Sequence, residues 1–145
     1  MNVDVSSDAV IDRPREQVAE FAANPDNAPA WYVNIKAVEW KSPKPLRRGS
    51  LVAFTAQFLG RKMEYTYEIT ELTPGEKLVM RTAQGPFPME TIYEWESLPS
   101  GRTRMILRNR GTPSGFSGVL APFVSMAMRR ANKKDLARLK SVLER

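Results

Sequence analysis

Two absences limit the chemistry that this chain can perform. Its 145 residues include no histidine and no cysteine. The sequence therefore has no Ser-His-Asp triad, no thiol nucleophile, no imidazole base and no zinc site of the usual ligand types. Any catalysis would rest on carboxylates, Tyr, Lys, Arg, Ser, Thr, Asn or ordered water. We expect no metal and no other cofactor.

The polar side chains of most interest are three tyrosines, Tyr65, Tyr67 and Tyr93, together with Thr91 and Asn109. Strand alternation places all five on one face of a predicted sheet, where buried polar groups need partners. Those partners could be one another, water or a ligand. A tyrosine could donate a proton to a carbonyl and Asn109 could orient one. The same register puts no carboxylate or lysine on this face, and an unperturbed tyrosine is a poor base at neutral pH.

The sheet that would hold these residues is predicted from register. Residues 51–59 and 62–71 flank Gly60-Arg61, a two-residue hairpin turn that pairs Leu59 with Lys62. This register separates an apolar and aromatic face from a polar one, and a slip of one residue would destroy the separation.

The following strands, 77–84, 89–97 and the segment after the loop 99–101, continue the same ladder. On the inner face the predicted neighbours are Met80 with Ile69, Thr82 with Tyr67, Trp95 with Met105, Tyr93 with Leu107 and Thr91 with Asn109; on the outer face they are Glu96 with Arg104 and Glu90 with Arg110.

Helical patterns lie at the two ends of the chain. Apolar residues recur at three- and four-residue steps over 116–143, which predicts a long helix that Pro122 kinks or breaks. Near the start, residues 2–11 read as a strand. Pro14 is expected at the first position of a short helix, and 27–35 as a second one carrying Trp31 and Tyr32. Strand character returns over 37–41.

This order resembles the helix-grip fold of the START-like, birch-pollen-allergen-like (SRPBCC) superfamily, and within it the polyketide cyclase/dehydrase-like group. The motifs that carry the resemblance span nearly the whole chain: Ile11-Asp12-Arg13-Pro14-Arg15-Glu16-Gln17-Val18, Phe21, Asn24-Pro25, Trp31, Phe58-Leu59-Gly60-Arg61, Tyr67-Glu68-Ile69-Thr70-Glu71 with Pro74, Gly118-Val119-Leu120-Ala121-Pro122 and Asp135-Leu136-Ala137-Arg138-Leu139-Lys140. The resemblance implies one α+β domain over residues 1–145. A curved antiparallel sheet of about seven strands would wrap around a long C-terminal helix, with two short helices after the first strand.

The resemblance also implies a cavity between sheet and helix. Its predicted ligand-binding residues are Trp31, Tyr32, Trp40, Phe54, Tyr65, Tyr67, Met80, Met89, Thr91, Tyr93, Trp95, Asn109, Phe116, Leu120, Phe123, Val124 and Met128. For each of the aromatic and methionine members ordinary core is the simpler reading, because a sheet needs apolar residues beneath its helix.

Two functions follow from such a cavity. The first is a carrier or sensor that binds a hydrophobic small molecule such as a lipid, an isoprenoid or a polyketide-like compound. The alternative is a polyketide cyclase or dehydratase acting on such a ligand. An ionisable group inside the cavity, such as Glu64, Glu90 or Arg108, would favour the enzyme. In a third case side chains fill the cavity and the protein acts through its surface.

The net charge of +6 permits anionic partners without choosing one. The outer face of the predicted C-terminal helix carries Arg129, Arg130, Lys133 and Lys134. These form either a solvated surface or a contact with an acidic membrane. We find no nucleic-acid motif, no apolar run that would span a bilayer and no signal peptide. A cytoplasmic protein is expected, as a monomer or a dimer.

Overall fold

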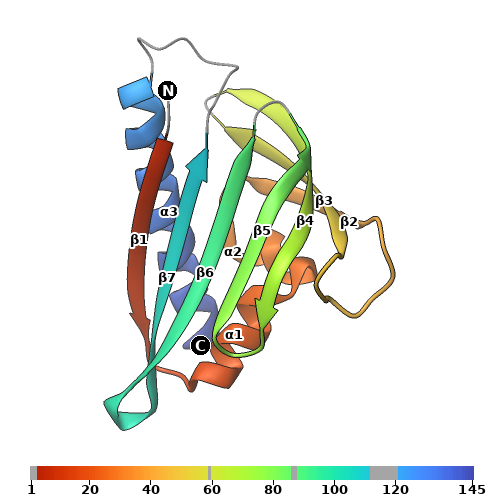
Figure 1. Ribbon diagram of the computed structural model, residues 1–145. Helices are drawn as coiled ribbons and strands as arrows, with labels where there is room; N and C mark the ends of the chain where they lie inside the picture. Colours follow the sequence, from red (N-terminus) through yellow and green to blue (C-terminus); the bar gives the residue numbers. More distant parts are fainter. Residues whose placement is uncertain (1–2, 59, 86–87, 112–120) are drawn as a thin grey trace.

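The computed structural model describes residues 3–58, 60–85, 88–111 and 121–145. In chain order the elements are β1 (Val3–Ile11), α1 (Arg15–Ala23), the 3-10 turn η1 (Pro25–Asn27), α2 (Ala28–Trp31), β2 (Ile35–Trp40), β3 (Leu51–Phe58), β4 (Arg61–Thr73), β5 (Lys77–Gln84), β6 (Met89–Leu98), the 3-10 turn η2 (Pro99–Gly101), β7 (Arg102–Gly111) and α3 (Ala121–Leu143). The strands form one antiparallel sheet in the order β1-β7-β6-β5-β4-β3-β2. This is the predicted α+β helix-grip architecture (Figure 1).

The sheet curls so that its concave face receives all three helices. The long helix α3 lies along β1, with further contacts to β7 and α2, and α1 packs on β6 and β7. Figure 1 shows α1 and α2 near the end of the groove where α3 finishes. Strands β3 to β5, by contrast, do not pack closely on α3.

Alternation along the strands explains which face is buried. In β1, Val3, Val5 and Ile11 are at most 1% exposed, whereas Asp4 and Asp8 between them face solvent. A strand that buries one face needs this period of two, because successive side chains point to opposite sides.

The short helices differ slightly from prediction. Helix α1 begins at Arg15, so Pro14 caps it from outside and is not its first residue. Asn24 then caps η1 by accepting the Asp26 backbone N–H at 3.0 Å. The second helix, α2, ends at Trp31, earlier than the predicted Ile35, because the chain enters β2 there and pairs with β3.

The β3–β4 register is shifted by two residues from the predicted one. Phe58 pairs with Arg61, and Phe54 with Tyr65, so the turn begins one residue earlier than Gly60-Arg61. Since side chains alternate with a period of two, a shift of two residues leaves each side chain on its predicted face. The other predicted neighbours on β4 to β7, on both faces, are confirmed.

Helix α3 spans Ala121–Leu143, and Pro122 lies in its first turn, where a missing N–H removes no helical hydrogen bond. The expected kink is therefore not needed within the described helix, and residues 116–120 lie outside the described part of the chain. Toward its end, Leu136 and Leu139 are at most 2% exposed against the sheet. Within the described residues no helix is both long and apolar enough to cross a bilayer.

Candidate functional site

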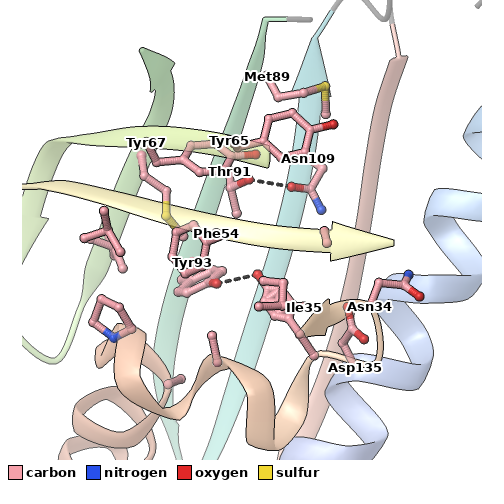
Figure 2. Close-up of a pocket in the computed structure, with 18 of the residues that line it drawn as sticks. Asn34, Ile35, Phe54, Tyr65, Tyr67, Met89, Thr91, Tyr93, Asn109 and Asp135 are labelled. Carbon is pink, nitrogen blue, oxygen red and sulfur yellow. Dashed lines mark hydrogen bonds between the residues drawn. The ribbon is translucent and has the colours of Figure 1, made fainter. Parts of the chain in front are cut away.

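A cavity of about 160 Å³ lies between the concave face of the sheet and the helices. In Figure 2, Met89, Tyr65 and Asn109 surround one part of it, and Tyr93 and Asp135 surround another. Strands β2 to β7 and all three helices contribute lining residues. A cavity of about 150 Å³ can hold one benzene ring, and drug-sized ligands need about 300 Å³ or more. The volume of this cavity is therefore closer to that of a single-ring site than to that of a drug-sized one.

Apolar and aromatic side chains form most of the wall. Four methionines contribute to it: Met63, Met80, Met89 and Met128. Methionine adapts to irregular shapes because it is unbranched and polarisable. The ring centroid of Tyr67 lies 5.8 Å from that of Phe54 and 5.8 Å from that of Tyr65, so three aromatic rings form one continuous wall.

A chain of hydrogen bonds crosses the cavity from the sheet to α3. The Thr91 hydroxyl donates to Asn109 Oδ1 at 2.6 Å, and Asn109 Nδ2 donates to Asn132 Oδ1 at 2.9 Å. Asn132 is 4% exposed, and its Nδ2 has no acceptor among the described residues. The chain therefore ends on a buried N–H group with nothing to bind, and such a group is costly to leave unpaired.

A second polar pair lies where α2 meets β6. The hydroxyls of Tyr32 and Tyr93 are hydrogen-bonded to each other. Burial raises the pKa of both phenols, so both stay protonated at neutral pH. Trp31 packs behind them, with its ring centroid 4.2 Å from that of Tyr32 and 5.7 Å from that of Tyr93.

The site also contains a carboxyl group that the strand register did not predict. Asp135 of α3 lines the cavity, is 5% exposed, and accepts the Val33 backbone N–H on Oδ1 at 2.8 Å. Burial raises the pKa of Asp135 to about 6, although the Val33 N–H and the positive charge of Arg138 act to lower it. The prediction that the inner face of the sheet carries no carboxylate or lysine holds for the described lining residues, and the carboxyl group in the cavity comes from α3 instead.

Helical spacing carries the signal for this group. Asn132 and Asp135 lie between Met128 and Leu139 at steps of four, three and four residues, so all four share the inner face of α3. Counting only apolar residues passes over the two polar ones.

The structure brings together ten of the predicted site residues. Lining the cavity are Tyr32, Phe54, Tyr65, Tyr67, Met80, Met89, Thr91, Tyr93, Asn109 and Met128. Sequence reasoning missed Asn34, Ile35, Met63, Asn132 and Asp135, along with small and aliphatic residues such as Val52 and Ala131. The predicted Phe116 and Leu120 lie outside the described residues.

Five predicted residues lie elsewhere. Trp31 is fully buried behind the tyrosine pair, and Trp40 and Trp95 border a different hollow, of about 780 Å³, beside α1. Val124 is buried against β1, and Phe123 faces outward with 64% of its surface exposed. Adjacent helical residues point about 100° apart, so the turn of α3 that buries Val124 directs Phe123 away from the sheet.

The charged residues that could have entered the cavity remain on the outer face. Glu90 is bonded to Arg110 at 2.6 Å and to Arg81 at 3.0 Å, and Arg108 is bonded to Asp4 at 2.6 Å. Glu64 is exposed. The predicted polar outer face of the sheet is confirmed. Among the described lining residues, the ionisable carboxyl group inside the cavity is that of Asp135.

A family model described as polyketide cyclase / dehydrase and lipid transport matches residues 2–144. Among solved structures, the Zhui aromatase/cyclase from Streptomyces sp. R1128 aligns with a TM-score of 0.83 at 15% identity, covering 100% of this chain and 95% of that one. A START superfamily protein from Mycobacterium smegmatis aligns with a TM-score of 0.83 at 14% identity, with 97% of each chain covered.

The ginseng major latex-like protein 151 from Panax ginseng aligns with a TM-score of 0.74 at 10% identity, covering 97% of this chain and 96% of that one. At these identities the likeness concerns the fold. No curated protein matches the sequence.

Proposed function

The chain belongs to the polyketide cyclase / dehydrase and lipid transport family, and from that premise we propose that it binds a hydrophobic small molecule in its cavity, as a carrier or sensor. The observation that carries the proposal is the cavity itself, an apolar and aromatic space with a short polar strip. Ligand sites in proteins combine these two features, since apolar walls supply affinity and a few polar groups fix orientation.

The size of the cavity narrows the ligand class. Its volume of about 160 Å³ supports a compact, ring-shaped compound over an extended acyl chain. Among lipids, isoprenoids and polyketide-like compounds, the polyketide-like rings fit this space best. The four flexible methionines in the wall allow some variation in ligand shape.

Native mass spectrometry of the purified protein, followed by organic extraction, tests the proposal. We expect a compound bound in a one-to-one ratio, or binding of a small aromatic probe when the protein is isolated empty. Ala131→Leu, which adds bulk inside the cavity, should abolish binding. Ala137→Leu, the same change on the exposed face of the same helix, should not. An empty protein that also binds no aromatic probe would contradict the proposal.

Asp135 supports a second candidate function, a cyclase or dehydratase. A carboxylate whose pKa lies near 6 is basic enough to remove a proton from a carbon between two carbonyls. The resulting enolate would attack the carbon of a second carbonyl group, and the Tyr32–Tyr93 pair could donate a hydrogen bond to the oxygen of that group as it becomes an alkoxide. The proton that Asp135 has taken up would then pass to this oxygen. Incubation with a short linear poly-β-ketone that can close into a single ring, with products followed by liquid chromatography and mass spectrometry, tests this function. A cyclised product should form faster than in buffer, and Asp135→Asn should remove the acceleration.

We also propose that α3 contacts acidic lipid when the ligand is exchanged. Its outer face carries Arg129, Arg130, Lys133 and Lys134, next to the exposed Phe123 and Met126, whereas the helix's one carboxylate, Asp135, faces inward. Basic residues near an anionic surface contribute about 1 kcal/mol each.

Co-sedimentation with vesicles tests this contact. Binding to vesicles with phosphatidylglycerol, and not to pure phosphatidylcholine, is expected, and it should fall with added salt. Arg130→Glu with Lys133→Glu should abolish it, while Lys62→Glu on β4 should reduce it only slightly. Equal binding by the double variant would exclude this face. A cytoplasmic location remains our prediction, checked by cell fractionation.

A further inference from the structure

The cavity has an unbalanced charge. Asp135 is the one carboxyl group among its described lining residues, and those residues include no lysine and no arginine. The nearest positive charge to act on Asp135 is Arg138, one turn further along α3 on the exposed side of the helix. An anion that entered the cavity would meet a carboxyl group and no counter-ion.

Two polar atoms in the wall lack partners and lie one helical turn apart. Oδ1 of Asp135 accepts the Val33 N–H, and no described residue forms a hydrogen bond to Oδ2. Nδ2 of Asn132, three residues earlier, has no acceptor. Both side chains are at least nine-tenths buried and line the cavity. The wall thus offers an acceptor that can be charged and, beside it, a neutral donor.

Aromatic rings lie close to this pair. Tyr32 directly precedes Val33, whose N–H binds Asp135, and the Tyr32 hydroxyl is hydrogen-bonded to that of Tyr93. Both tyrosines line the same cavity as Asp135. Aromatic rings attract cations through the negative potential of their faces, most strongly where water is excluded. A carboxylate among tyrosine rings is therefore a suitable environment for an ammonium group.

On the basis of the proposed ligand-binding function, we propose that the cavity prefers a compact ring compound whose polar end is a basic nitrogen, and that it rejects carboxylates. The nitrogen donates to Asp135 Oδ2. A neutral alcohol can replace the amine with lower affinity, because it donates the hydrogen bond without supplying the charge.

Three probes with one carbon skeleton separate the charge types: 2-phenylethylamine, 2-phenylethanol and phenylacetate. Dissociation constants are measured by NMR titration of the full-length protein at pH 7.5. We expect the amine to bind about tenfold more tightly than the alcohol, and phenylacetate to bind at least tenfold more weakly than the alcohol. Asp135→Asn should reduce the amine to the affinity of the alcohol. Glu64→Gln, which removes the same charge from the exposed face of β4, should keep the wild-type order.

Wild-type protein gives an independent test through pH. Tyr32 and Tyr93 on the packed elements, Arg138 on α3 and the Val33 N–H face or influence Asp135. Burial raises the pKa of both tyrosines, so both stay protonated throughout the test. Since burial raises the pKa of Asp135 to about 6, the carboxyl is largely neutral at pH 5. Amine affinity should therefore fall several-fold from pH 7.5 to pH 5, and alcohol affinity should stay constant.

The outcomes distinguish this inference from the function on which it rests. If the alcohol binds and phenylacetate binds as tightly as the amine, or if Asp135→Asn leaves the order unchanged, the charge preference is wrong and ligand binding stands. If none of the three probes binds wild-type protein at millimolar concentration, both proposals fail.

Discussion

The groove between the curled sheet and α3 is filled at one end and hollow at the other. Where the last turns of α3 pack on the sheet, Met105, Leu107 and Leu139 have no exposed surface, and neither has Trp31 in the same cluster. Toward the other end, side chains of similar size, among them Met63 and those named above in the cavity, surround an empty space of about 160 Å³.

The inner face of α3 changes where this difference occurs. After Asp135 it presents leucines to the sheet, and before Asp135 it presents Asn132, Ala131 and Met128. Three leucines fill the groove, whereas a methionine, an alanine and an asparagine do not. Since strand alternation is the same at both ends, the hollow is determined mainly by the helix.

Removing bulk at the two ends should have unequal effects on stability. Leu139→Ala in the filled end should lower the free energy of unfolding by about 3 kcal/mol or more, because a close-packed site leaves a new cavity behind. Met63→Ala in the cavity wall should cost about 1–2 kcal/mol, since one side of Met63 already borders empty space. Urea unfolding measures both. Equal losses would show that the hollow closes in solution.

Asp135→Asn tests whether the buried charge in the hollow end lowers the free energy of unfolding. In the folded protein, burial raises the pKa of Asp135 from 3.8 to about 6. The folded state therefore binds the proton more tightly, and the stability that this provides is complete below about pH 4 and lost as the pH rises through 6. Asparagine has no charge to bury, so the variant should be more stable than wild type by about 2 kcal/mol at pH 7.5.

Below about pH 3 the two proteins should unfold alike, because the wild-type carboxyl is then mostly neutral in both states. Thermal unfolding at about pH 3 and at about pH 7.5 gives the comparison. A variant that is less stable at pH 7.5 would mean that the carboxylate gains more from Val33 and Arg138 than it loses by burial.

Sequence alone predicted the sheet well because period-two alternation determines faces directly. It placed Tyr93 opposite Leu107 and Met80 opposite Ile69, as the structure has them. The β3–β4 turn was placed one residue late, because Gly60 suits a turn that begins at either 59 or 60. The resulting shift of two residues changed the partners and kept every face.

The helix side of the site was harder to predict. The register of a strand can be checked against its neighbouring strands, whereas a helix offers only its own periodicity. For residues at the edge of the apolar face of a helix, periodicity does not decide whether the side chain points toward the sheet or toward solvent. Phe123 was assigned inward and lies outward, and Asp135 was passed over among leucines. The raised pKa of Asp135 results from burial among residues that are far apart in the chain. A local sequence pattern therefore does not predict this pKa.

Thr91→Val tests the polar chain that crosses the hollow end. Thr91 is 4% exposed, and its hydroxyl donates a hydrogen bond to Asn109 Oδ1. Valine at this position would leave Asn109 Oδ1 without that donor in a buried site. Stability should fall by about 1–2 kcal/mol. Thr66→Val, a partly exposed position on the outer face of β4, should change it by less than about 0.5 kcal/mol. Similar losses for both would mean that water replaces the missing donor.

The smallest change in stability is expected on the outer face of the sheet. There, exposed ion pairs join neighbouring strands, and few side chains are packed. Glu96 lies 3.7 Å from Arg104, and both side chains are about half exposed. Glu96→Gln should lower stability by less than about 0.5 kcal/mol, because solvent screens the pair and Arg104 keeps its shorter contact with Asp8 at 2.7 Å. Unfolding in low and high salt measures the effect, which should vanish in 1 M salt. A larger loss of stability that persists in high salt would mean that the ion pairs on the outer face stabilise the curvature of the sheet. They would then also help to set the width of the cavity.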